Sequence, residues 1–475
     1  MFQRGPSREI VPEPSPRAES GPELVEGDVN TSARRSDWRA SLGRDASDLL
    51  ERDAAAFVHQ SLSTPCLSAL RRAEGSWLED TDGRRYLDLH GNSVHQVGHA
   101  HPAVVEAVVN QLRSLPFCPR RYTNRPAIEL AERLGELSPW GRTGTKVLLL
   151  PSGAAAISLA VKIARLATGR SGTVSMWDSF HGATLDAIAI GGEEMFRHGL
   201  EPFSSDALHV QPCRPAACRL GCHGSCSLAC AAELEAALLH TPPAAALVSE
   251  AVRCTTVDIP PPDYWPRARK ACGVRGVLMV IDEIPTGLGR TGRMFAFEHF
   301  DLPPDIIVLG KGLGGGVVPM AAVMVRADLP IPVSASVGHF THEKSPIGAA
   351  AALATLDVLS DERLVERSRS LGRRALDRLN RWSSGHPAVK EVRGLGLLIG
   401  IELRGGPDLA DAALYGCLRR GVSLKVSAGS VLTISPPLNI TEDDLWAGLD
   451  AVVSSVDEIA PSRNAGQHRA PEVAS

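Results

Sequence analysis

Short apolar runs alternate with helical stretches through the central part of this 475-residue chain. Runs of this length suit buried strands rather than core helices. Continuous apolar strands separated by helices are typical of an α/β fold with a mostly parallel sheet covered on both faces. Such sheets bind ligands at the carboxyl ends of their strands, so functional side chains are expected there. The runs cover residues 146–150, 173–176, 245–248 and 277–281.

The same pattern divides the chain into segments. Both ends are polar and lack apolar periodicity, so we expect them to be disordered tails. Between the tails we expect a large domain flanked in sequence by the two parts of a smaller α+β domain, which begins with a hairpin around Asp82-Gly83. The expected segments are a tail at 1–45, the first part of the small domain at 46–105, the large domain at 106–345, the rest of the small domain at 346–460 and a tail at 461–475.

Charge and hydropathy exclude several classes of partner. Asp and Glu number 54 against 50 Lys and Arg, a net charge of -4, so the chain is not expected to bind nucleic acid. No apolar run approaches the ~18–20 residues of a membrane span, so no membrane partner is expected. The first twenty residues carry charges where a signal peptide needs an apolar core, which predicts a cytoplasmic protein.

Two strand ends carry reactive side chains. One apolar strand ends in Asp282-Glu283, which places a carboxylate at the ligand edge of the sheet, unless Asp282 merely caps the following turn. Another delivers Lys311 into a run of glycines that allows a bulky group to approach the backbone. Gly312 follows this lysine, so the segment is not a Walker phosphate loop. In a partly apolar pocket Lys311 would be an amine nucleophile, whereas in an exposed loop it would be an ordinary surface lysine.

Two further segments complete the pattern. Ser152, Gly153 and Ala154 lie between a strand and a helix, where free backbone N–H groups suit a phosphate. Phe180 follows another strand and brings an aromatic ring to the same edge. An acid, a lysine, a phosphate site and an aromatic face are together what pyridoxal 5'-phosphate requires. The sequence therefore predicts that cofactor.

The ordered motifs resemble those of the class III aminotransferases, fold-type-I pyridoxal-phosphate enzymes that include ornithine and ω-amino-acid aminotransferases. The resemblance covers roughly residues 64–459, and Lys311 follows Asp282 by 29 residues, as expected for that family. It implies a large domain with a mostly parallel seven-stranded sheet, a small α+β domain and a homodimer. The motifs are Gly75-Ser76-Trp77, Gly98-His99-Ala100-His101-Pro102, Phe180-His181-Gly182, Asp282-Glu283-Ile284 and Gly287-Leu288-Gly289-Arg290-Thr291-Gly292.

The resemblance also implies roles for individual residues. Lys311 would hold the cofactor as a Schiff base and act as the base, and Asp282 would partner the ring nitrogen. Phe180 and Ile284 would sandwich the ring. The remaining cofactor residues would be Ser152, Gly153 and Ala154 at the phosphate, Thr341 at the phosphate of the neighbouring subunit, and His181 and Glu250 nearby.

A small amine with an anionic end is the expected substrate. Arg393 matches the family's arginine for a substrate carboxylate, which it could grip with two hydrogen bonds. The alternative is that Arg393 only packs the fold. Asn92 and His95, in an unusually polar loop, and Arg121, in an arginine-rich segment, are further candidates.

Departures from the family pattern leave the reaction open. Thr255 stands where many members have a glutamate that neutralises the arginine, and Pro285 replaces a glutamine near the cofactor. Residues 341–346 depart from the usual phosphate segment. Class III relatives include ammonia-lyases and phospho-lyases acting on phosphonate or phosphorylated amines. Aminotransferase is the leading expectation, because it is the majority activity of the class, and lyase is the alternative.

Half of the ten cysteines fall in one short stretch: Cys213, Cys218, Cys222, Cys226 and Cys230. They could bind zinc, but the C-x₂-C spacing of structural zinc sites is missing. Spacing of four residues would instead place the last three on one helical face. Reduced thiols or one reversible disulfide are favoured, and no metal is expected.

Overall fold

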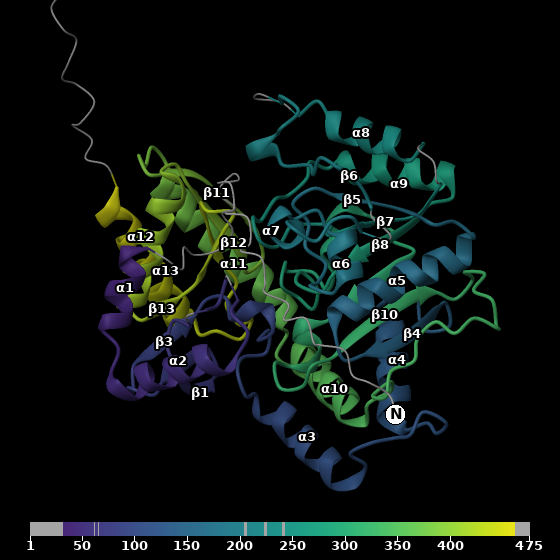
Figure 1. The fold of residues 1–475 in the computed structure, drawn as a ribbon, viewed down its shortest axis with the longest axis horizontal. Helices are drawn as coiled ribbons and strands as arrows, with labels where there is room; N and C mark the ends of the chain where they lie inside the picture. The colour runs from purple at the N-terminus through teal and green to yellow at the C-terminus, as the bar shows by residue number, and fades with distance from the viewer. Residues whose placement is uncertain are drawn as a thin grey trace, which may run out of the picture.

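A computed structural model describes residues 32–60, 62–64, 66–203, 207–222, 226–239 and 243–460. Two bodies are visible in Figure 1: the large sheet with its helices, in blue to green, and a smaller domain that joins the purple N-terminal and yellow C-terminal elements. Within the described residues, no helix is both long and apolar enough to span a membrane. The expected tail at 461–475 and most of the one at 1–45 lie outside the described residues.

A seven-stranded, mostly parallel sheet forms the large domain, as the sequence predicted. The strand order is β4-β10-β9-β8-β7-β5-β6, and β10 alone runs antiparallel to its neighbours. The sheet contains β4 (Thr145–Leu150), β5 (Gly172–Met176), β6 (Leu208–Val210), β7 (Ala244–Ser249), β8 (Leu278–Asp282), β9 (Ile306–Leu309) and β10 (Ala321–Arg326).

Helices cover both faces of this sheet because its central strands are apolar on both sides. Val280 of β8 and Val308 of β9 pack with Ile157 of α5 (Gly153–Thr168), whereas Met279 belongs to the opposite layer with Trp265 of α9. Because β5, β7, β8 and β9 run parallel, their carboxyl ends lie at the same edge of the sheet. The remaining helices of this part are α6 (Leu185–Ile190), α7 (Glu194–Arg197), α8 (Ala229–Ala237) and α9 (Tyr264–Arg275).

Helix α10 (Pro346–Asp361) connects several parts of the molecule. It packs against α3 (Pro102–Ser114), α4 (Arg125–Leu137) and the short 3-10 helix η4 (Lys311–Gly314). Ser345 caps its start by accepting a hydrogen bond from the backbone N–H of Gly348. The helix therefore joins the segment that carries Lys311 to the helices on the lower side of Figure 1.

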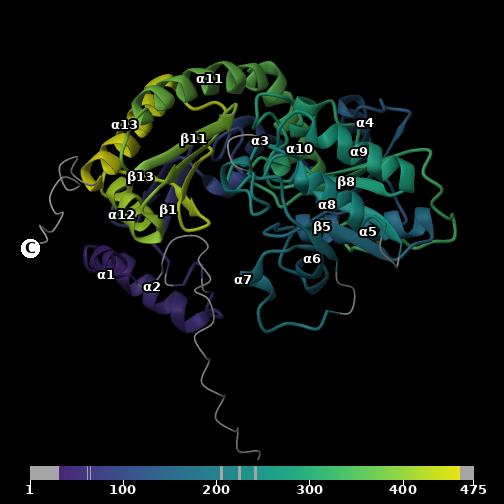
Figure 2. The same cartoon turned by 90° about the horizontal axis from the view of Figure 1, so that it is seen from above.

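The small domain contains two four-stranded sheets. In Figure 2 its long helices lie along the outer side of β11. The first sheet has the order β1-β2-β3-β13, and the second β11-β12-β15-β14. Their strands are β1 (Leu70–Glu74), β2 (Trp77–Asp80), β3 (Arg85–Asp88), β11 (Val389–Leu395), β12 (Leu398–Leu403), β13 (Val422–Ser423), β14 (Lys425–Ser427) and β15 (Val431–Ile434), and their helices α11 (Leu364–Ser383), α12 (Gly406–Arg419) and α13 (Glu442–Ile459).

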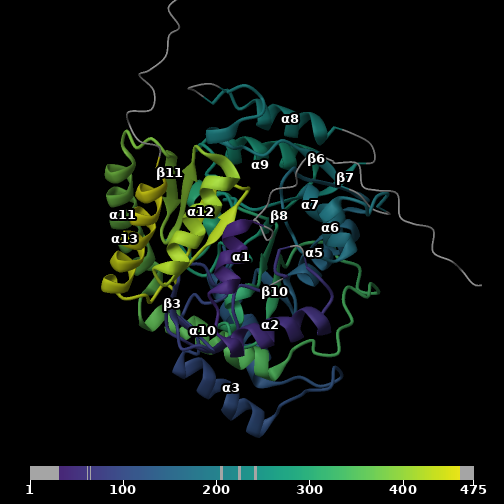
Figure 3. The ribbon, with the colours of Figure 1, turned by 60° about the vertical axis from the view of Figure 1, so that its left-hand side comes forward.

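Part of the expected N-terminal tail is ordered, which corrects the prediction for residues 32–45. Helix α1 (Ala33–Ala40) packs against α12, and α2 (Arg44–Ala56) follows it (Figure 3). Trp38 is buried between the rings of Tyr86 and Tyr415, and Arg34 pairs with Asp408. The polar composition hid this helix because its buried face is narrow and depends on partners far away in the sequence.

Candidate active site

The carboxyl ends of β8 and β9 bring Asp282 and Lys311 to the same edge of the sheet. Asp282 is the last residue of β8 and pairs in register with Val308 of β9, three residues before Lys311. Lys311 has a left-handed backbone with φ 42°, which turns the chain sharply after the strand. Its side chain is exposed and therefore accessible to a ligand.

His181 fixes the Asp282 carboxylate. The two side chains are buried, and His181 Nδ1 lies 2.7 Å from Asp282 Oδ2. The backbone N–H of Ile284 donates to the other carboxylate oxygen at 3.0 Å. His181 Nε2 has no hydrogen-bond partner among the described residues. Asp282 therefore has two contacts: its Oδ1 caps the following turn, and its Oδ2 contacts His181 at the sheet edge.

The start of α5 forms a narrow cradle beside Asp282. Ser152 is the N-cap residue but its side chain makes no capping hydrogen bond, so the first N–H groups of the helix remain available to an anion. A Cβ atom on Gly153 would lie 2.9 Å from Ile284 Cδ1, and one on Gly182 would lie 2.3 Å from the Cβ of Ala154. Glycine at both positions therefore keeps this space open.

Aromatic and aliphatic side chains border the cradle. Ile284 contacts it from the turn after β8, and Phe180 lies just before His181. The Phe180 ring packs on Phe196 with ring centroids 4.7 Å apart. The cradle, the exposed lysine, the fixed carboxylate and the open helix start fit pyridoxal phosphate. The start of α5 would hold its phosphate, Phe180 and Ile284 would border its ring, and Asp282 and Lys311 would serve its ring nitrogen and its aldehyde.

Glu250 is held by its own turn at the end of β7. Its Oε2 accepts from Arg253 Nη1 at 2.7 Å, and its Oε1 accepts from the backbone N–H of Cys254 at 3.1 Å. Arg253 was not singled out by the sequence, although a basic residue three positions after an acidic one at a buried strand end is the kind of signal that could have identified it. A direct contact between Glu250 and the cofactor remains a prediction.

The three polar candidates of the N-terminal region lie in different environments. Asn92 has a left-handed backbone in the loop after β3, and Arg121 is exposed. His95 is fully buried, with its Nε2 3.6 Å from Asp88 Oδ2. Burial lowers the pKa of His95 to about 4. Its contact with a substrate remains a prediction, and in this structure its ring is packed into the fold.

The Asp88 carboxylate lies next to two histidine side chains, His95 and His99. His99 Nε2 lies 2.9 Å from its Oδ2, and the ligand-type atoms of Asp88, His95 and His99 all lie within 4.8 Å of one another. Burial works against the charged carboxylate, but the hydrogen bond to His99 and the nearby His95 bring the pKa of Asp88 to about 2. We interpret the group as a hydrogen-bonded support for the 90–93 loop.

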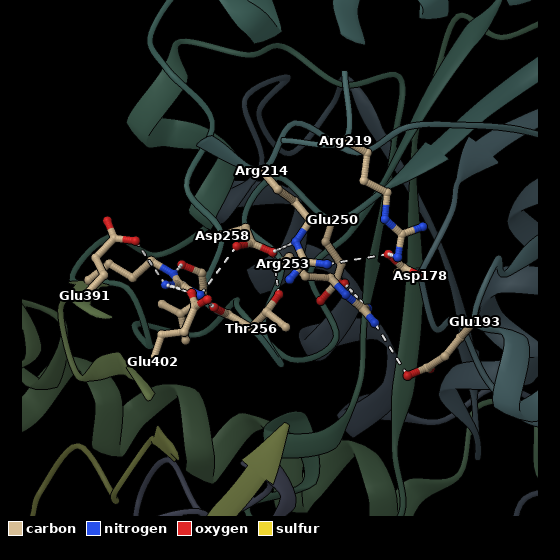
Figure 4. A network of polar contacts seen from close by, with 12 residues as sticks. Asp178, Glu193, Arg214, Arg219, Glu250, Arg253, Thr256, Asp258, Glu391 and Glu402 are labelled. Atoms are coloured by element: carbon tan, nitrogen blue, oxygen red, sulfur yellow. Dashed lines mark hydrogen bonds and ion pairs between the residues drawn. The ribbon is translucent and has the colours of Figure 1, made fainter. Parts of the chain in front are cut away.

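Arg393 is enclosed by acceptors, of which Thr256, Asp258, Glu391 and Glu402 are labelled in Figure 4. Its Nη1 donates to Glu402 at 2.6 Å and to Glu391 at 3.1 Å, and its Nη2 donates to the backbone carbonyl of Thr256 at 2.6 Å. Asp258 lies 3.6 Å from Nη2. Glu402 was not singled out from the sequence. It lies on β12, the strand paired with β11, diagonally opposite Arg393. The predicted role of Arg393 in gripping substrate would require release from these partners.

A cavity of about 420 Å³ lies beside this network. Glu250, Arg253 and Glu402 help to line it, whereas Asp282 and Lys311 do not. Arg214, which also lines the cavity, pairs with Asp258 at an Nε to Oδ2 distance of 2.9 Å and with Asp178 (Figure 4). The charged side chains that line the cavity are thus largely paired with one another.

All ten cysteines are free thiols. The predicted helical face of Cys222, Cys226 and Cys230 is wrong, because α8 begins at Ala229 and the earlier two lie in loop segments. Cys213 and Cys230 instead contact each other, and hydrogen bonding between their thiols raises the pKa of Cys213.

Thr341 lies on the surface next to the arginine-rich segment. The neighbouring His342 ring packs on Phe117 at 5.3 Å, and Asn124 Nδ2 donates to the carbonyl of Lys344 at 3.0 Å. The exposed Thr341 side chain is therefore free to face another molecule. Its predicted contact with a partner subunit's phosphate remains a prediction.

Comparisons with known proteins agree with this site. The family model "Aminotransferase class-III" matches residues 58–456. The chain is 40% identical to the (R)-1-hydroxy-2-aminoethylphosphonate ammonia-lyase of Vibrio splendidus (strain 12B01) over 457 residues, covering 91% of this chain and 95% of that protein. It is 35% identical to the acetylornithine aminotransferase of Mycobacterium tuberculosis (strain H37Rv) over 405 residues, covering 85% and 94%.

Solved structures give the same answer for the fold. An aminotransferase from Bacillus anthracis matches with a TM-score of 0.78 and 27% identity, covering 90% of this chain and 99% of that one. The ornithine aminotransferase of Toxoplasma gondii, described with pyridoxal phosphate at its active site, matches with a TM-score of 0.78 and 27% identity, covering 90% and 98%. The chain belongs to the class III aminotransferase family of pyridoxal-phosphate enzymes.

Proposed function

We propose that this enzyme removes ammonia from a small 1-hydroxy-2-aminoalkylphosphonate. The observation that carries the proposal is the extent of the match to the ammonia-lyase, 40% identity across 95% of that protein, against 35% across 405 residues for the acetylornithine aminotransferase. This reverses the order of the two expectations drawn from the sequence, in which amino transfer came first.

The surroundings of Arg393 support elimination. An aminotransferase binds two substrates in turn, and an arginine that meets only one of them needs a counter-ion that can move away. Thr255 stands at the position of that glutamate. Glu402 pairs with Arg393 instead, and its other oxygen accepts from Lys390 Nζ at 2.6 Å. A lyase with one charged substrate needs no such exchange.

Pyridoxal phosphate, when bound, supplies an electron-withdrawing ring that stabilises negative charge on the carbon next to the substrate nitrogen. Lys311 can remove the proton from that carbon, because its side chain is the accessible amine at this edge. His181 fixes the Asp282 carboxylate, which would partner the ring nitrogen, and the open start of α5 would hold the phosphate. The hydroxyl of the neighbouring carbon takes up a proton and leaves as water. One water is then consumed as the carbon–nitrogen bond is broken, which releases ammonia and leaves an aldehyde.

The test compares products with and without an acceptor. Wild-type enzyme loaded with cofactor is mixed with 1-hydroxy-2-aminoethylphosphonate in the absence of any 2-oxo acid. We expect ammonia and aldehyde in amounts far above the enzyme concentration. A reaction that stops after one turnover and resumes on addition of pyruvate or 2-oxoglutarate would contradict elimination.

Amino transfer is the second candidate function. The relatives that favour it are the acetylornithine aminotransferases and the aminotransferases of known structure. In that case the donor would be a small amine or amino acid with an anionic end. Incubation of N-acetylornithine with 2-oxoglutarate would then give glutamate, and phosphonate substrates would give no free ammonia.

We also propose a cytoplasmic homodimer. Ten free thiols suit a reducing compartment. Apolar side chains of α3 and the following segment are exposed, and they lie near Thr341, the residue expected to reach the neighbouring active site. The exposed group comprises Val105, Val109, Leu112, Leu115, Phe117 and Tyr122.

A further inference from the structure

Four of the ten free cysteines keep part of their surface accessible: Cys66, Cys218, Cys222 and Cys226. The last three belong to the cysteine-rich stretch, to which the proposed function gives no role. A thiol reacts with a dissolved oxidant only when it can be reached, and its thiolate is the form that attacks. Hydrogen-bond donors that point at an accessible sulfur therefore mark a reactive cysteine.

Ser227 directs two polar groups at the sulfur of Cys222. Its backbone N–H donates to Cys222 Sγ at 3.4 Å, and its hydroxyl oxygen lies 3.3 Å from the same sulfur. Hydrogen bonds to the charged form of a group favour that form. The Ser227 hydroxyl and then its backbone N–H lower the pKa of Cys222 to about 7. At neutral pH about half of this thiol is therefore ionised.

Cys66 has the opposite environment, although it is also partly accessible. Its thiol donates a hydrogen bond to Asp53 Oδ2 at 3.7 Å. Burial and the negative charge of Asp53 raise the pKa of Cys66. Two partly accessible cysteines thus differ in the amount of thiolate they carry, because donors face the sulfur of Cys222 and a carboxylate faces the sulfur of Cys66.

A second thiol stands at the other end of a short turn from Cys222. The turn is centred on Arg219 and Leu220, and Gly221 follows it with a left-handed backbone, φ 77°. A turn of this kind brings its ends to within about 7 Å, and a disulfide needs Cα atoms about 4.4–6.8 Å apart. The chain around the turn therefore suits a covalent bond between Cys218 and Cys222.

Cys218 also belongs to the wall of the cavity of about 420 Å³. Its two neighbours in the sequence, Ala217 and Arg219, both line that cavity. Arg219 Nη2 lies 3.4 Å from Asp178 Oδ2, and Figure 4 shows the two side chains next to each other. A disulfide at Cys218 would tie this part of the wall to the segment that carries Cys222.

We propose that Cys222 is a site of reversible oxidation by a hydroperoxide and that Cys218 closes a disulfide with it. In the first step the Cys222 thiolate attacks one peroxide oxygen, so that an S–O bond forms and the O–O bond breaks. The leaving oxygen takes up the proton that Cys222 released, and the sulfur becomes a sulfenic acid. In the second step the Cys218 sulfur attacks the oxidised sulfur, an S–S bond forms, the S–O bond breaks, and water leaves with the Cys218 proton. The peroxide is reduced and the two thiols are oxidised.

The first test measures the reactivity of each thiol without a substitution. Reduced, cofactor-loaded wild type is alkylated with iodoacetamide between about pH 6 and 9, and each cysteine is followed by peptide mass spectrometry. At pH 7 we expect Cys222 to react on the order of 10-fold faster than Cys66. Ser227→Ala should move the Cys222 profile to higher pH and leave that of Cys66 in place. Equal rates at Cys222 and Cys66 in wild type overturn the inference.

The second test identifies the disulfide. One equivalent of hydrogen peroxide should join Cys218 to Cys222 in wild type, and dithiothreitol should restore both thiols. In Cys218→Ser, the sulfenic acid of Cys222 should persist and be trapped by dimedone. Cys66→Ser is the matched control and should form the disulfide as wild type does, with circular dichroism confirming the fold of each variant. No disulfide in wild type, or one that joins Cys222 to Cys226, overturns the inference.

Discussion

Two adjacent carboxylates at the end of β8 have different tasks. Asp282 faces His181 at the ligand edge, whereas Glu283 points into the core and accepts from the backbone N–H of Phe297 and from Thr286, both at 2.9 Å. Burial raises the pKa of Glu283 to about 7. Asp282 thus faces the ligand edge, whereas Glu283 stabilises the turn, because successive residues of a strand point to opposite faces of the sheet.

Lys311 provides the sharpest test at this scale. Lys311→Ala should abolish turnover, because no other described amine occupies the same sheet edge beside Asp282, and the fold should persist because the side chain is exposed. Steady-state assays give the first result, and circular dichroism with thermal unfolding gives the second. Activity equal to wild type in this variant would remove the assignment.

The buried His95 predicts a pH dependence of stability. Its folded pKa is about 4, below the ordinary 6.5, so the unfolded chain binds a proton at this position before the folded chain does. Stability from this group is therefore lost as pH falls from about 6.5 to about 4, by at most roughly 3 kcal/mol. His95→Gln should show a flatter fall in unfolding free energy over this range, measured by urea titration. Parallel curves would contradict it.

The sequence identified the site residues whose position depends only on the strand that precedes them. Asp282, Lys311 and the α5 start follow apolar strands directly, so strand topology alone brings them to one edge. Glu402 was not identified from the sequence, because it contacts Arg393 across a strand pairing whose register depends on the whole small-domain sheet. The enclosure of Arg393 followed from the same pairing and was not visible in its motif.

At the scale of elements, the strands were predictable and the N-terminal helix was not. The apolar runs around 146–150 and 277–281 match β4 and β8 because burial on both faces demands continuous apolar residues. Helix α1 offers no such run. Its main anchor is Trp38, which reaches Tyr86 in β3 and Tyr415 in α12.

Removing that anchor should detach the N-terminal helices. We expect Trp38→Ala to cost about 3 kcal/mol, within the range for a buried aromatic side chain. Phe57→Ala is the matched control, because this ring at the end of α2 is 71% exposed and should cost little. Denaturant unfolding and limited proteolysis near residue 60 would measure both. Equal stability of the two variants would contradict a packing role for α1.

At the scale of the whole molecule, the exposed apolar group on α3 and the following segment predicts the assembly. Leu112→Glu should convert the dimer to a monomer and weaken cofactor retention, because Thr341 lies near the same surface. Light scattering after gel filtration and cofactor absorption would measure the two effects. Val274→Glu is the control, since this residue on α9 is 74% exposed and lies away from α3. A dimeric Leu112→Glu protein would refute this interface.

The position of α10 has a consequence for how the enzyme behaves in dilute solution. One face of this helix supports η4, which begins with the reactive amine, and it also supports α3 and α4. Separation of subunits would loosen α3 and, through α10, the loop that presents Lys311. Specific activity should therefore fall when the protein is diluted below a threshold concentration, and it should recover when the protein is concentrated again. Each subunit would then be active only when it is associated with a second one.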